Sequence, residues 1–116
     1  MEKIQDMDLR KMLLELEEKL QRVYGNKLKA VILYGSVARG TATEESDIDI
    51  MVLVDGTAQE LRTFEDQLSD VSADISIKYF KVFSIMDISY QEYMRWVNTS
   101  PFYRNVSKEG VILYAA

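Results

Sequence analysis

Residues 31–54 read VILYGSVARGTATEESDIDIMVLV, and this stretch decides the fold. An apolar run at residues 30–34 precedes Gly35-Ser36, and a second apolar run at residues 48–54 follows a polar loop. Short continuous apolar runs bounded by turn residues are typical of buried strands. The stretch therefore predicts two strands joined by a turn and a loop.

The turn between the two strands has the composition of a phosphate-binding segment. Gly35 allows a tight turn and lets a ligand approach the backbone closely. If Ser36 to Arg39 form a short helical turn, their free N–H groups and the Ser36 hydroxyl face one concavity. Such a concavity favours a phosphate group. Taken alone, however, Gly-Ser after a strand is also typical of an ordinary turn.

The second polar feature is a pair of carboxylates at the start of the second strand. Asp47 and Asp49 are two residues apart, so strand periodicity places them on one face while Ile48 and Ile50 point into the core. Neighbouring carboxylates repel each other, and a bound divalent cation, or a pair of cations, removes that cost. Taken alone, Asp-x-Asp at the start of a strand is also common on a solvated edge. The combined pattern of a strand, Gly-Ser, a turn, an acidic loop and Asp-x-Asp instead predicts a nucleotide- and metal-binding site.

Helices and further strands are expected on both sides of this stretch. The evidence for them is apolar spacing, Ser/Thr caps followed by Glu, and one run of β-branched and aromatic residues. In chain order we expect helix 8–24, strand 30–34, strand 48–54, a helix from 57, one long strand or two joined by a bend over 74–85, a helix from 89, a helix over 100–110, and a strand or extended tail at 111–114. This order predicts an α/β (α+β) fold in which helices flank a mixed sheet, with residues 1–116 forming a single domain.

The composition excludes several kinds of chemistry. The chain has 116 residues with neither His nor Cys, so thiol nucleophiles, Ser-His-Asp catalysis and Cys-ligated zinc are excluded. A metal would have to be a hard, oxygen-preferring ion such as Mg²⁺ or Mn²⁺. Fourteen Lys+Arg against nineteen Asp+Glu argue against a nucleic acid partner. No signal-peptide core or membrane-spanning run is present, so we expect a cytoplasmic protein without a membrane partner.

The run GSVARGTATEESDIDIMVLV resembles the signature of the nucleotidyltransferase superfamily typified by DNA polymerase beta. The helix ahead of VILYGS and the closing SPFYRNVSKEGVILY resemble the minimal nucleotidyltransferases, including antitoxins of the MntA-like type. This resemblance implies the polymerase-beta-like fold and Mg²⁺-dependent transfer of a nucleoside monophosphate from ATP or another NTP. By position, Gly35 and Ser36 would bind the triphosphate, and Asp47 and Asp49 would bind the metal.

The resemblance also implies a third acidic residue on a later strand facing the first two. Asp74 is our candidate for this catalytic and metal-binding position, because it opens the strand expected over 74–85. Asp70 and Asp87 are the alternatives, and a domain without the third acid would be weakly active or inactive. Of the two lysines on the expected strand, Lys78 shares a face with Asp74, whereas Lys81 does not.

Two further residues belong to the candidate nucleotide-binding set. Arg39 could neutralise phosphate charge, although an arginine in a short turn is as often a surface residue. Ser46 is expected to cap or brace the backbone at Asp47 rather than to react.

Three functions remain open from the sequence, and the third and weakest of them is nucleotide sensing without transfer. The first is an adenylyltransferase whose acceptor is a protein hydroxyl, since the resemblance includes antitoxins that adenylylate a HEPN toxin on a tyrosine. The second is a binding module that neutralises a partner without catalysis. The C-terminal half is dense in aromatic residues, which fits core packing first and a partner-binding or self-association surface second. These residues are Tyr79, Phe80, Phe83, Tyr90, Tyr93, Trp96, Phe102 and Tyr103.

Overall fold

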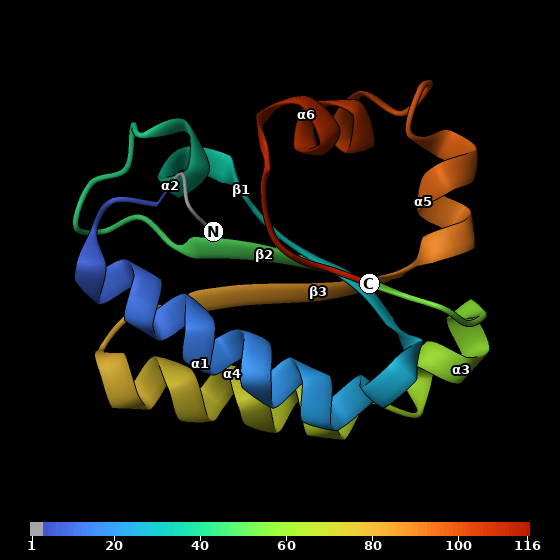
Figure 1. Cartoon of the computed structure of the whole chain (residues 1–116), viewed down its shortest axis with the longest axis horizontal. Helices are drawn as coiled ribbons and strands as arrows, with labels where there is room; N and C mark the ends of the chain where they lie inside the picture. Colours follow the sequence, from blue (N-terminus) through green and yellow to red (C-terminus); the bar gives the residue numbers. More distant parts are fainter. Residues whose placement is uncertain (1–3) are drawn as a thin grey trace.

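The fold is a four-stranded sheet with a layer of helices on each face, as seen in a computed structural model that describes residues 4–116 (Figure 1). Helices α1 and α4 lie side by side on one face, α5 and α6 lie on the other, and α2 lies beside the start of β2. In chain order the elements are α1 (Met7–Tyr24), the 3-10 turn η1 (Gly25–Lys27), β1 (Leu28–Tyr34), α2 (Gly35–Arg39), β2 (Ile48–Val54), α3 (Ala58–Arg62), α4 (Glu65–Tyr79), β3 (Phe83–Ser89), α5 (Tyr90–Trp96), α6 (Pro101–Glu109) and β4 (Val111–Ala115). The predicted α+β architecture with a mixed sheet is confirmed.

The strand order is β3-β2-β1-β4, so β2 and β1 are the central strands. Strand β1 pairs antiparallel with both β2 and β4. Strand β3 pairs parallel with β2, with Asp49 opposite Ser84 and Val52 opposite Asp87. A parallel neighbour needs a crossover connection, which α3 and α4 provide.

Alternation along β2 divides its side chains between two cores. Ile50 and Val52 lie in the larger core, which α1 and α4 cover. Met51 and Leu53 lie in a smaller core, on the face that α5 and α6 cover. Asp49 is two residues from Met51, so it lies on the α5–α6 face. The predicted inward direction of Ile48 and Ile50 is confirmed by their burial.

The prediction of a strand over 74–85 is wrong for the first half of that range. Residues up to Tyr79 belong to α4, and β3 begins only at Phe83. Leu68 and Ile75 are buried, and Val71 and Tyr79 pack beside them at helical spacing. The helical period of the apolar residues therefore outweighs the β propensity of Ile, Val and Tyr. The helix expected from residue 57 is also divided, into α3 and α4.

Several predicted helix ends are confirmed. Thr57 and Glu60 form the complete capping box of α3. The Ser89 hydroxyl accepts from the Glu92 N–H at the start of α5, and Ser100 caps α6 ahead of Pro101. None of the helices within residues 4–116 has the length and apolar character needed to cross a bilayer.

A hydrogen bond between α1 and β3 leads to a stability prediction. The buried Tyr24 hydroxyl donates to Asp87 Oδ2 over 2.8 Å, and its burial together with this bond raises the pKa of the tyrosine. We expect Tyr24→Phe to lower the free energy of unfolding by about 1–2 kcal/mol, because it leaves a half-buried carboxylate without its donor. Urea unfolding followed by circular dichroism measures the change.

Tyr114→Phe is the control, because the Tyr114 side chain also packs against the larger core but its hydroxyl makes no side-chain hydrogen bond within residues 4–116. An equal loss of stability in the two variants would contradict a specific contribution from the Tyr24–Asp87 bond.

Candidate active site

The turn after β1 lies against the carboxylate of Asp49. Gly35 has a φ of +77°, a conformation that residues with a side chain rarely adopt. A Cβ placed on Gly35 would overlap Asp49 Oδ2 and lie 3.2 Å from Asp49 Cγ. Glycine is therefore required here both for its backbone conformation and for the space that the carboxylate occupies. The predicted helical turn is present as α2, and it begins at this contact.

The two acidic residues lie on the same side of the sheet, near the start of β2. Asp47 is exposed and Asp49 is half-buried. Burial raises the pKa of Asp49, the charge of Asp47 raises it further, and the nearby Arg39 guanidinium partly offsets both effects. The mutual repulsion predicted for this pair is thus present in the structure. A bound cation would relieve it.

Arg39 joins α2 to α6 at the edge of the site. Its Nη1 lies 3.4 Å from Glu109 Oε2, and both side chains remain about half exposed. An exposed ion pair of this kind contributes little to stability. The ion pair matters for the site because it keeps the Arg39 guanidinium close enough to Asp49 to lower the pKa of that carboxyl.

Ser46 supports the acidic loop rather than the backbone of Asp47. Its hydroxyl accepts from the Thr43 N–H over 2.9 Å, and its own N–H donates to the Thr43 carbonyl over 3.1 Å. At the other end of the loop, the Thr41 N–H donates to the Ser36 carbonyl over 3.0 Å. These bonds shape the connection between α2 and Asp47.

The structure does not bring Asp74 to the acid pair. It lies on α4 with an exposed side chain, as does Asp70, because residues 65–79 form a helix instead of the expected strand. Asp87 is on β3, but it is opposite Val52 and accepts a hydrogen bond from the Tyr24 hydroxyl on the α1 side of the sheet. Within residues 4–116, no third acidic side chain joins Asp47 and Asp49 in a group that could hold a metal.

The expected orientation of Lys78 is also corrected. Lys78 lies on α4, and its Nζ is 2.8 Å from Glu15 Oε1 of α1. The Tyr79 hydroxyl donates to the same oxygen, so two hydrogen bonds connect α4 to α1. The same two bonds lower the pKa of Glu15. Lys81 follows the helix and lines a hollow with Ser46 and residues of α1.

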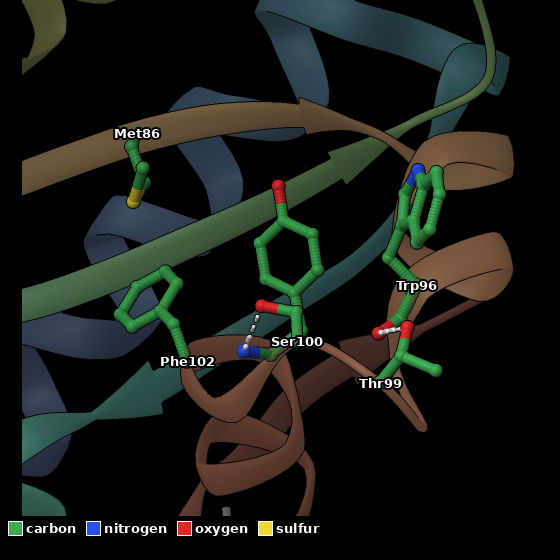
Figure 2. A pocket seen from close by; sticks show the side chains of 6 residues that line it. Met86, Trp96, Thr99, Ser100 and Phe102 are labelled. Carbon is green, nitrogen blue, oxygen red and sulfur yellow. Dashed lines mark hydrogen bonds between the residues drawn. The ribbon is translucent and has the colours of Figure 1, made fainter.

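A pocket of about 540 Å³ with three aromatic residues in its lining lies on the α5–α6 face. Figure 2 shows Met86 and Phe102 on one side of it and Trp96 on the other. Ser100, Thr99 and Tyr103 complete the lining. The Tyr34 hydroxyl contacts Met86 Sδ at 3.3 Å, and its ring packs edge-on against Phe102.

Tyr34 is a site residue that the sequence reasoning missed. It pairs with Asp49 across the two central strands, and burial together with the charge of Asp49 raises the pKa of its hydroxyl. The tyrosine therefore separates the acid pair from the aromatic pocket. Its place directly before Gly35 was the signal that could have identified it.

Residues 9–112 match the family described as "Nucleotidyltransferase domain", and this chain belongs to that family. The predicted resemblance is confirmed.

Two relatives come from Methanocaldococcus jannaschii, and both carry the name "Putative protein adenylyltransferase". One is 35% identical over 108 residues, which cover 93% of this chain and 100% of that protein. The other is 32% identical over 75 residues, covering 63% of this chain and 72% of that protein.

Solved structures share the fold at lower identity. A "putative nucleotidyltransferase" from Sulfolobus solfataricus superposes with a TM-score of 0.59 at 21% identity, covering 90% of this chain and 81% of the other. A toxin–antitoxin crystallised with AMP-PNP superposes with a TM-score of 0.57 at 21% identity, covering 88% and 73%.

The contact between Gly35 and Asp49 predicts different outcomes for two similar substitutions. Gly40 also has a φ of +77°, but no atom lies within 4 Å of a Cβ placed there. We expect Gly40→Ala to cost about 1–2 kcal/mol of stability from its backbone alone. Gly35→Ala should cost more and should also abolish Mg²⁺-dependent ATP binding, because its methyl group displaces the Asp49 carboxylate.

Urea unfolding and isothermal titration calorimetry with MgATP separate the two effects. If both variants lose ATP binding equally, the contact with Asp49 is not what requires glycine at position 35.

Proposed function

We propose that this chain transfers AMP from ATP to a hydroxyl group of a partner protein. The hydroxyl oxygen bonds to the α-phosphorus, the α,β phosphoanhydride bond breaks so that pyrophosphate leaves, and the hydroxyl proton passes to solvent. The observation that carries the proposal is the approach of Gly35 to Asp49, which joins a phosphate-suited turn to the acid pair. The relatives named as protein adenylyltransferases support a protein acceptor. The net charge of −5 supports the same choice over a nucleic acid.

Each site residue has a role in this proposal. Gly35 and Ser36 hold the triphosphate at the start of α2, and Arg39 adds positive charge beside it. Asp47 and Asp49 hold Mg²⁺ or Mn²⁺, and an exposed and a half-buried carboxylate on one face fit the oxygen preference of such ions. When bound, the ion stabilises negative charge on the phosphoryl oxygens.

We further propose a HEPN-type toxin as the partner, in the cytoplasm, with this chain as its antitoxin. The fold shared with a toxin–antitoxin structure supports this choice. The aromatic pocket gives a partner segment an apolar surface to contact, and Tyr34 connects it to the acid pair, since it pairs with Asp49 and packs against Phe102.

A second candidate function is a binding module that neutralises its partner by complex formation. Two observations favour it: the acid pair has no third acid among the described residues, and Trp96 and Phe102 are exposed on α5 and α6. Under this alternative, the nucleotide site contributes nothing to neutralisation.

A transfer assay tests the first function. The chain is incubated with Mg²⁺, α-labelled ATP and a HEPN-type protein, and label on that protein is measured after denaturing electrophoresis. We expect Asp47→Asn/Asp49→Asn to lower transfer by about a hundredfold or more, since the charge stabilisation at the phosphates is lost.

Asp74→Asn is the matched control, because it removes one carboxylate from an exposed position on α4 and should transfer label at the wild-type rate. Equal labelling by the double variant and the wild type would reject the proposed catalytic pair. Neutralisation by the double variant without any labelling by the wild type would establish the binding module instead.

A further inference from the structure

We infer that this chain holds one divalent cation with its nucleotide rather than a pair, because Ser84 occupies the place where a third carboxylate would face Asp47 and Asp49. The inference rests on the proposed function, since it concerns the same site.

The parallel register places Ser84 beside the acids. Ser84 pairs with Asp49 across β2 and β3. Its hydroxyl donates to Asp47 Oδ2 over 3.5 Å, so it lies on the same side of the sheet as both carboxylates. The Ser84 side chain is exposed, and the position can therefore accept a larger polar residue.

The neighbouring positions of β3 supply no substitute ligand. Met86 is the next residue on that face, and its thioether is a poor ligand for a hard cation. The acid of this strand, Asp87, is one residue further on and so lies on the opposite face, where Tyr24 bonds it. Strand periodicity thus keeps the carboxylate of β3 away from the pair.

Charge and ligand number then limit the site to one ion. Two carboxylates and the phosphate oxygens of a nucleotide suffice for a single hard cation. A second cation, about 3.5–4 Å from the first, would need further anionic oxygen from the protein. The Ser84 hydroxyl is neutral and supplies a donor to Asp47 instead.

Electron paramagnetic resonance with Mn²⁺ tests the inference without any catalytic turnover. The chain is saturated with Mn²⁺ and an ATP analogue whose α,β bridging oxygen is a methylene group. We expect the wild type to bind one ion and to show no spin coupling between ions. Ser84→Asp should bind two and show the coupled spectrum of adjacent ions, whereas Ser84→Ala should still bind one.

Ser107→Asp is the control for added charge, because it introduces the same carboxylate at an exposed position of α6 outside the site. This variant should still bind one Mn²⁺ ion. Circular dichroism establishes that Ser84→Asp is folded, and if it is not, the wild-type count decides alone.

The possible failures are distinguishable. Two coupled ions in the wild type, or an unchanged count in folded Ser84→Asp, would overturn this inference and leave the proposed function intact. Absence of any protein-bound ion in the presence of the analogue would overturn the metal site, and with it both proposals.

Discussion

The central strand β2 must satisfy a different environment on each face, and the rest of the structure depends on this constraint. Ile50 and Val52 are buried against the α1–α4 layer, while Met51 and Leu53 are buried under α5 and α6. Both faces are covered along most of the strand, which is why its sequence reads as a continuous apolar run. Near the start of β2, the exposed Asp47 and the half-buried Asp49 remain in contact with solvent.

Close packing at this point joins the fold to its chemistry. The α2 backbone can approach Asp49 only because Gly35 has no side chain. Tyr34 then fills the space between the carboxylate and the aromatic pocket, with its ring against Phe102. Arg39 connects the same turn to α6 through Glu109. The C-terminal helices thus form one wall of the site, in addition to covering the sheet.

Much of this arrangement could be predicted from the sequence, because its determinants are local. The two strands, the turn at Gly35 and the shared face of Asp47 and Asp49 all follow from residues within one short stretch. The end of α4 could not be predicted so well, since Ile75 and Tyr79 fit either a strand or an amphipathic helix until their packing partners are known. The pairing of Ser84 on β3 with Asp49 could not be predicted either. The register of a parallel pair depends on the length of the crossover between its strands. Because residues 74–79 were expected to be part of the strand rather than of α4, Asp74 was the predicted third acid in place of a residue of β3.

The strand order also has a consequence for how the chain folds. Strands β1 and β2 are joined by a short connection, but Leu33 pairs on its other side with Val111. The residues around Gly35 and the acid pair therefore leave the ribosome well before the strand that completes the sheet. Until β4 arrives, the backbone of β1 presents an unpaired edge, which is the kind of surface that recruits strands from other chains. Docking of β4 removes this exposed edge, since it pairs with β1 along its free side.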